Sequence, residues 1–159
     1  MADMLVKLFE LPPLQPEIDK MKALGITVRK PIGPENYKVR DWIKEHFSEG
    51  WAGEAENSFF NNPKTMYIAL RETEKGSEML GFACWDATVK GFFGPTGVKE
   101  SERKKGIGKA LLLACLHGMY NDGYAYGIIG SPGPFDFYAK VCGAVTIEGS
   151  GESIYKGML

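Results

Sequence analysis

The stretch GFFGPTGVKESERKKGIGKALL, residues 91–112, joins an interrupted strand, a cationic loop and the start of an apolar helix. Three consecutive cations, residues 103–105, precede the closely spaced Gly106 and Gly108. Glycine lets the backbone approach a ligand closely, and the first amides of a helix can point at an anion because they lack intrahelical acceptors. Cations at a helix start are slightly unfavourable unless an anion binds. The stretch therefore predicts a phosphate site, against the alternative of a glycine-loosened helix start with solvated charges.

Spacing excludes two familiar phosphate loops. A dinucleotide-binding GxGxxG motif would need glycine or alanine where Leu111 stands. A Walker A loop that used Gly108 and Lys109 would need glycine at the position of Arg103 and serine or threonine at that of Ala110.

The strand at residues 91–98 contains a proline and two internal glycines. Pro95 cannot donate to a sheet ladder, and Gly94 and Gly97 favour a bulge. We expect pairing with the following strand to fail here, so that the sheet splits. The alternative is an edge strand that tolerates proline.

Apolar periodicity and turn residues divide the rest of the chain into elements. Strands are predicted at residues 26–32, 65–72, 78–89, 91–98 and 124–130 and as a closing pair within 144–159; helices are predicted at residues 34–47, 50–62, 105–120 and 134–143. This order predicts an α+β domain over residues 26–159, with helices on the faces of a sheet. Residues 1–25, which contain three prolines, are expected to form an extended arm and a short helix that ends at Gly25.

Composition limits the classes of partner. The chain has 159 residues with 19 Lys and Arg against 20 Asp and Glu, so its charge gives no general affinity for nucleic acid or an anionic membrane. Cys84, Cys115 and Cys142 are odd in number and widely spaced, which favours reduced core residues over disulfides or a structural zinc site. The first residues do not resemble a signal peptide, so the cytoplasm is the expected location.

The cationic loop resembles the coenzyme A loop of the GNAT superfamily of N-acetyltransferases, whose signature is [Q/R]-x-x-G-x-[G/A]. Arg103, Gly106 and Gly108 match it, after a strand that ends at Val98 and before a long apolar helix. The resemblance implies a mixed, mostly antiparallel sheet of six to seven strands, split between the fourth and fifth predicted strands. It also implies acetyl-CoA as cosubstrate and no metal. The residues implied to bind acetyl-CoA are Thr96, Gly97, Val98, Arg103, Lys104, Lys105, Gly106, Ile107, Gly108 and Lys109.

In the family the pantetheine arm lies in the split and pairs with the strand as an added peptide would. An amide near Gly97 or Val98 is then implied to polarise the acetyl carbonyl.

The resemblance places a general acid at Tyr138. In the family an asparagine often stands seven residues before this tyrosine and an alanine four before; here those residues are Ser131 and Pro134. The distance from Tyr138 to Gly143 is also one residue longer than usual.

The sequence alone does not identify the general base that would deprotonate the amine. An alkylammonium, with a pKa near 10.4, must lose a proton before it attacks a thioester. Asp86, in an apolar strand beside the interrupted one, is the first candidate, against the alternative that it caps a strand-end turn. Glu54 and Glu56 are the next candidates, since the corresponding region of the family commonly lines the acceptor site. Trp51, Trp85 and Phe92 are candidate wall residues of that site, against the alternative that these aromatic residues belong to the core.

Together these features predict acetyl transfer from acetyl-CoA to a primary amine of a small molecule or peptide, by direct attack in a ternary complex. The alternative is a non-catalytic acyl-CoA-binding module. No nucleic-acid or membrane partner is expected. A homodimer is compatible with the resemblance, because dimers are common among GNAT proteins.

Overall fold

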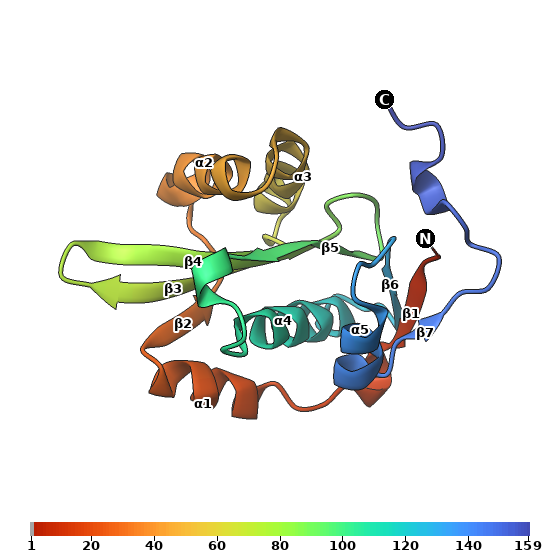
Figure 1. Cartoon of the computed structure of the whole chain (residues 1–159), viewed down its shortest axis with the longest axis horizontal. Coiled ribbons are helices and arrows are strands. Elements are labelled where there is room, and N and C mark those ends of the chain that lie inside the picture. Colours follow the sequence, from red (N-terminus) through yellow and green to blue (C-terminus); the bar gives the residue numbers. More distant parts are fainter. Residues whose placement is uncertain (1) are drawn as a thin grey trace.

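A seven-stranded sheet organises the protein (Figure 1). We describe residues 2–159 of a computed structural model. The strand order is β2-β3-β4-β5-β6-β1-β7, and every neighbouring pair is antiparallel except β5 and β6. The strands are β1 (Met4–Lys7), β2 (Ile26–Arg29), β3 (Met66–Thr73), β4 (Gly76–Trp85), β5 (Phe92–Val98), β6 (Tyr126–Ile129) and β7 (Val145–Thr146). The predicted α+β class with a mixed, mostly antiparallel sheet is confirmed.

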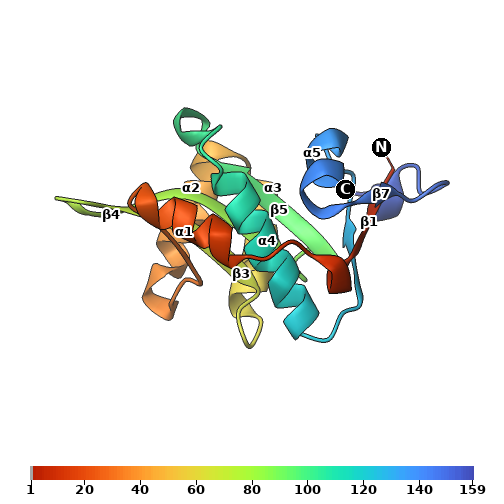
Figure 2. The same cartoon turned by 90° about the horizontal axis from the view of Figure 1, so that it is seen from below.

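Five α-helices cover both faces of the sheet, as predicted. Helices α2 (Asn36–His46) and α3 (Glu49–Phe60) lie on one face, and α1 (Gln15–Ala23) and α4 (Ile107–Asn121) on the other (Figures 1 and 2). The fifth helix, α5 (Phe135–Cys142), contributes Tyr138 and Cys142 to the core on the α4 side. No helix within residues 2–159 is long and apolar enough to cross a membrane.

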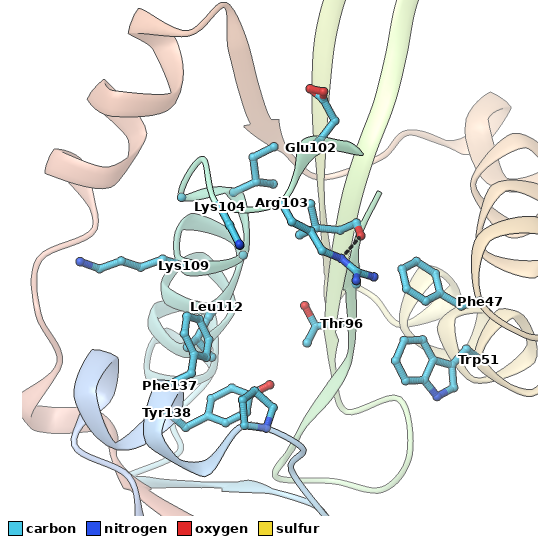
Figure 3. Close-up of a pocket in the computed structure, with 16 residues that line it drawn as sticks. Phe47, Trp51, Thr96, Glu102, Arg103, Lys104, Lys109, Leu112, Phe137 and Tyr138 are labelled. Carbon is cyan, nitrogen blue, oxygen red and sulfur yellow. Dashed lines mark hydrogen bonds between the residues drawn. The ribbon is translucent and has the colours of Figure 1, made fainter. Parts of the chain in front are cut away.

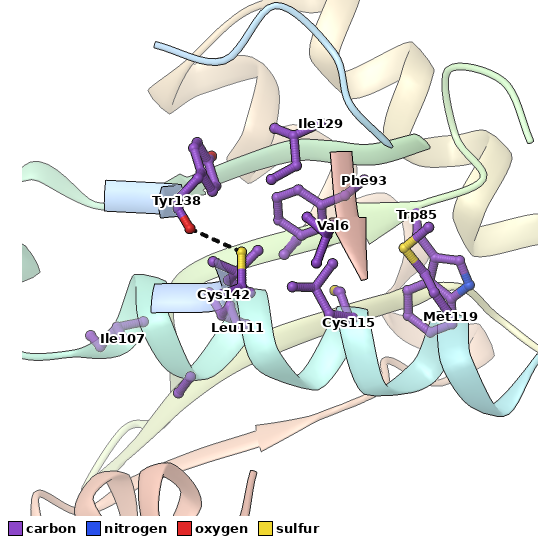
Figure 4. Packing of buried hydrophobic residues seen from close by; sticks show 14 of the residues in the cluster. Val6, Trp85, Phe93, Ile107, Leu111, Cys115, Met119, Ile129, Tyr138 and Cys142 are labelled. Atoms are coloured by element: carbon purple, nitrogen blue, oxygen red, sulfur yellow. Dashed lines mark hydrogen bonds between the residues drawn. The ribbon is translucent and has the colours of Figure 1, made fainter. Parts of the chain in front are cut away.

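Helix α4 is the centre of the larger core (Figure 4). Its side chains are buried nearly all round, because the sheet lies on one side and α1 and α5 cover others. At Gly118 a Cβ atom would lie 2.6 Å from the ring of Trp85, so only glycine lets α4 approach the sheet this closely. The three cysteines are buried and unpaired, as predicted.

The predicted split lies between β5 and β6. These strands pair only at Phe92 with Ile128 and at Phe93 with Ile129, and no pair follows from Gly94 onward. The separation begins beside Pro95, which lacks an N–H group and cannot continue the ladder. The sheet therefore opens toward the end of β5 that leads into the cationic loop.

Both ends of the chain differ from the prediction. Met4–Lys7, expected in an arm outside the domain, forms β1 between β6 and β7, because Met4 and Val6 alternate into the core. The helical part of that segment is confirmed by α1. The expected closing pair of strands reduces to the two-residue β7. Beyond it, positive φ angles at Gly149 and Gly151 turn the chain into a short 3-10 helix at Ser153–Tyr155.

Candidate active site

A cavity of about 520 Å³ occupies the opening beside β5 (Figure 3). The end of β5 and the start of α4 form two of its walls, and Phe47 and Trp51 lie opposite Leu112 and Tyr138. The predicted cofactor residues that line it are Thr96, Gly97, Val98, Arg103, Lys104, Gly106, Ile107, Gly108 and Lys109. The structure thus gathers nine residues of the sequence prediction around one cavity, together with Tyr138.

Gly106 shapes the loop at one end of this cavity. It is the residue before α4 and has φ of +91°, a conformation that side chains other than glycine rarely adopt. A Cβ atom there would also lie 3.3 Å from Cε of Met21. This turn directs the first amides of α4, which have no acceptor within the helix, toward the cavity. Bare backbone and unpaired amides fit the requirement of a diphosphate.

The loop cations make specific contacts. Nζ of Lys109 lies 3.2 Å from Oε1 of Glu17, and Nζ of Lys105 lies 3.1 Å from Oε1 of Glu102. Lys105 does not line the cavity, unlike Lys104 and Lys109. Lysines 104 and 109 are therefore the ones placed to meet an anion there.

Glu102 anchors the base of the loop. Its buried carboxylate accepts from Arg71 at 2.6 Å and from Lys105. The Arg71 guanidinium, more than Lys105, lowers the pKa of Glu102 to about 2 against the opposing effect of burial. The carboxylate therefore stays charged and fixes the loop to β3 near neutral pH.

The open edge of β5 presents backbone donors to the cavity. The amide of Lys99 donates to the carbonyl of Leu80 on β4, at 2.8 Å. Because backbone groups alternate in direction along a strand, the amides of Val98 and Thr96 point away from β4 into the opening. The carbonyl of Val98, on the same side, accepts from Nε of Arg103 at 3.1 Å. Val98 rather than Gly97 thus supplies the donor nearest the loop.

Tyr138 lies at the other side of the cavity. Its ring packs edge-on against Phe93 and Phe137, with centroid distances of 6.4 and 5.1 Å. Burial, and more weakly Cys142, raises the pKa of its phenol to about 12. The hydroxyl therefore keeps its proton at neutral pH, as a proton donor must.

A second cavity, of about 760 Å³, adjoins the first. Phe93, Gly94 and Pro95 of β5 line it, whereas the next residues of the same strand line the first cavity. Trp51 lines both cavities. The two cavities thus take consecutive parts of β5 and share Trp51 as a wall residue.

Glu54 is the acidic residue of the second cavity. It lies on α3 one turn after Trp51, and its Oε1 accepts a hydrogen bond from the hydroxyl of Thr88. Glu56 lines neither of these two cavities.

Asp86 lies elsewhere, which corrects its interpretation as the base. Both carboxylate oxygens accept from the hydroxyl of Tyr124, at 3.0 and 2.9 Å, and Oδ1 also accepts from the amide of Gly91 at 2.7 Å. The residue lines neither cavity. Its φ of +52° ends β4 at Trp85, four residues before the predicted strand end. Asp86 caps the turn into β5, the alternative that the sequence left open.

Asp3 fixes the last part of the second cavity. Its Oδ1 accepts from the amide of Ser131 at 3.0 Å and its Oδ2 from the hydroxyl of Ser153 at 2.6 Å, while its own amide donates to Oγ of Ser150 at 2.8 Å. These bonds hold the segment that carries the wall residues Ile154, Tyr155 and Met158.

A family model described as the acetyltransferase (GNAT) family matches residues 36–143. The chain belongs to the GNAT family. The family is described as one of acetyltransferases. No curated protein sequence matches the chain.

Solved structures resemble this GNAT domain at low sequence identity. One is a GCN5-related glucosamine N-acetyltransferase region of a fungal multi-domain GH3 β-N-acetylglucosaminidase, with a TM-score of 0.73, 14% identity and coverage of 92% of this chain and 19% of that one. Another is a GCN5-related N-acetyltransferase from Sphaerobacter thermophilus, with a TM-score of 0.67, 20% identity and coverage of 92% and 48%. At this identity they show the fold, and this chain spans less than half the length of either.

The GNAT resemblance left several site residues unpredicted. Phe47 covers Gly97 so closely that a Cβ atom there would lie 2.3 Å from its ring, and Thr88 and Tyr155 reach the second cavity from distant segments. Of these three residues only Phe47 could have been found from the sequence, because it lies on the apolar face of the helix predicted at residues 34–47. Among residues 2–159 no three His, Cys, Asp or Glu side chains cluster as metal ligands would.

Proposed function

We propose that this GNAT domain is an N-acetyltransferase that moves the acetyl group of acetyl-CoA to a primary amine of a small molecule or peptide. Direct attack takes place in a ternary complex. The observation that carries the proposal is the pair of cavities that meet along β5 beside Trp51, one with a cationic glycine loop and the other with a carboxylate.

The first cavity fits acetyl-CoA. The amides that begin α4, with Lys104 and Lys109, hold the diphosphate at the loop. The amide of Val98, the donor nearest the loop, pairs with the pantetheine arm in the split, as an added strand would. Lys105 stabilises the loop through its ion pair with Glu102 and does not contact the diphosphate directly.

The reacting groups then meet between Thr96 and Tyr138, at the end of the first cavity that is next to the second. The amide of Thr96 donates a hydrogen bond to the acetyl oxygen as negative charge develops on it, while the amine nitrogen forms its bond to the acetyl carbon. The bond from that carbon to sulfur breaks, and Tyr138 protonates the departing thiolate.

Glu54 takes the role of base that the sequence offered first to Asp86. Its carboxylate lies in the second cavity, where an acceptor would bind, and Thr88 fixes its orientation. It accepts the proton that the ammonium of the acceptor must lose before attack. Glu54 takes one proton from the ammonium before attack. The nitrogen loses a second proton as the tetrahedral intermediate collapses, and this proton replaces the one that Tyr138 gives to the thiolate. The products are therefore the N-acetyl amide, free CoA and one proton, which Glu54 releases to solvent.

Thiol release tests this function against a non-catalytic acyl-CoA-binding module. We expect release of CoA, measured with a thiol reagent, to depend on both acetyl-CoA and an amine. Calorimetry would establish acetyl-CoA binding independently. Tight binding without amine-dependent release across a broad panel would favour the binding module and contradict the enzyme.

A further inference from the structure

The second cavity carries one kind of charge. Among the residues that line it within the described part of the chain, 2–159, Glu54 is the sole charged side chain. No lysine or arginine lines this cavity, in contrast to the first cavity, here proposed to bind acetyl-CoA and called the cofactor cavity, which is lined by Arg103, Lys104 and Lys109. An acceptor that enters meets a single negative charge.

The polar groups around Glu54 are already engaged. Thr88 donates to Glu54, and Nδ2 of Asn57 donates to the carbonyl of Ala87 at 3.0 Å. Few side chains are thus left to bind the hydroxyl groups of a polar acceptor. Removing such groups from water without new partners is costly.

The remaining wall is mostly apolar and comes from separate segments. Its larger apolar side chains are those of Trp51, Val89, Phe93, Pro95, Ile154, Tyr155 and Met158. Ser48 and Ser131 also line the cavity, and Oγ of Ser48 accepts from the amide of Trp51 at 3.1 Å. Surfaces of this kind favour the burial of hydrocarbon or an aromatic ring.

We propose that the acceptor is a cationic amine with an apolar body and no acidic group. This inference rests on the proposed function and specifies the substrate of the same site. Glu54 binds the ammonium and removes its proton, while the apolar wall holds the body. A carboxylate or phosphate on the acceptor is rejected because it would be desolvated beside Glu54 with no cation to pair with.

Four amines test the proposal with purified full chain and saturating acetyl-CoA. The probes are 2-phenylethylamine, phenylalaninol, phenylalanine and glucosamine, and the readout is kcat/KM from thiol release. Phenylalaninol and phenylalanine have nearly the same shape and differ in a hydroxymethyl group against a carboxylate. We expect phenylalaninol to be used at least about 100-fold better than phenylalanine, since a buried charge without a partner is much less favourable than a neutral group. We expect 2-phenylethylamine to exceed glucosamine at least about tenfold.

Glu54→Gln and Glu56→Gln form a matched pair of variants on one helix. Glu54→Gln should lower kcat/KM for 2-phenylethylamine by at least about 100-fold, whereas Glu56→Gln should keep it within about threefold. Acetyl-CoA affinity, which depends on the other cavity, should be unchanged in both and reports that each variant is folded.

The outcomes separate the inference from the proposed function. Equal use of phenylalaninol and phenylalanine, or better use of glucosamine than of 2-phenylethylamine, would overturn the substrate class and leave the acetyltransferase intact. Acetyl-CoA binding without transfer to any amine would overturn the function and the inference with it. Full activity of Glu54→Gln would overturn the role of Glu54 in recognising the ammonium.

Discussion

Lys109, beside the cofactor cavity, pairs with Glu17 of α1 at 3.2 Å. Glu17 is buried, and although burial would raise its pKa, hydrogen bonds from Lys109 and Lys20 lower it. A carboxylate from the first 25 residues therefore lies next to the site implied to bind a diphosphate. The pair stabilises the loop and at the same time competes with the anion for Lys109.

Replacement of Glu17 by Gln should separate these two effects. Stability should fall by about 1 kcal/mol, because a partly buried pair is lost. Affinity for acetyl-CoA should rise about two- to fivefold at low salt, because Lys109 no longer shares its charge. Thermal unfolding and calorimetry measure the two quantities, and Asp19→Asn on the exposed side of α1 is the control. Weaker binding in Glu17→Gln would mean that Glu17 positions Lys109 rather than competing for it.

Gly106→Ala should weaken acetyl-CoA binding at least about tenfold, because alanine is strained by more than 1 kcal/mol at a φ far into the positive range. Gly53→Ala, at an exposed position of α3 that lines neither cavity, is the control. Nothing lies within 4 Å of a Cβ atom there, and alanine favours a helix over glycine. Calorimetry with both variants checks the expectation. If Gly106→Ala and the control bound acetyl-CoA with equal affinity, the role of Gly106 in binding the diphosphate would be refuted.

Tyr138→Phe should lower kcat by about 10²- to 10⁴-fold and leave the Kd for acetyl-CoA unchanged, since the ring keeps its packing and only the proton donor is lost. The phenol has its pKa raised to about 12, so it holds its proton until the pH approaches that value. Wild-type kcat should therefore show no decline from Tyr138 ionisation between pH 7 and 10. Stopped or continuous thiol assays across this range measure both effects. A variant as active as the wild type would remove the acid assignment.

Asp3→Asn should raise the KM for the amine several-fold without changing acetyl-CoA affinity. Asp3 holds Ser131 and Ser153, so its loss releases the segment that carries one wall of the second cavity. Glu152→Gln, an exposed change in the same segment, is the control. If Asp3→Asn raises the KM for acetyl-CoA as well as the KM for the amine, Asp3 supports the fold as a whole rather than this wall.

Glu102 makes stability depend on pH in a defined direction. Its pKa is lowered in the folded protein from an ordinary 4.5 to about 2, so the contribution is complete above pH 4.5 and is lost as the pH falls toward 2. Glu102→Gln should destabilise the protein by about 1–3 kcal/mol at neutral pH, because Arg71 loses its charged partner. The difference in Tm between wild type and variant should shrink as the pH falls through this window. Glu10→Gln, at an exposed pair with Lys7, should show little effect at any pH. A Tm difference independent of pH would contradict the charged role of Glu102.

Those features of the fold and of the site that depend on local backbone chemistry can be predicted from the sequence alone. Pro95 cannot donate to a ladder, and the split of β5 from β6 begins beside it. Gly106 permits a positive φ angle, and the turn into α4 uses it. The GNAT resemblance, rather than local chemistry, pointed to Tyr138, and this residue lines the cavity that the loop also lines.

Which segments meet depends on long-range packing and is seen only in the folded protein. Asp86 and Glu54 are both carboxylates among apolar neighbours, and their roles separate only because Tyr124 engages Asp86 whereas α3 carries Glu54 to the second cavity. Met4–Lys7 forms a strand through pairing with residues more than a hundred positions away. The periodicity of apolar residues indicates whether a segment forms a helix or a strand. It does not indicate which strand pairs with a sheet edge or which groups surround a charged side chain, because both depend on long-range packing.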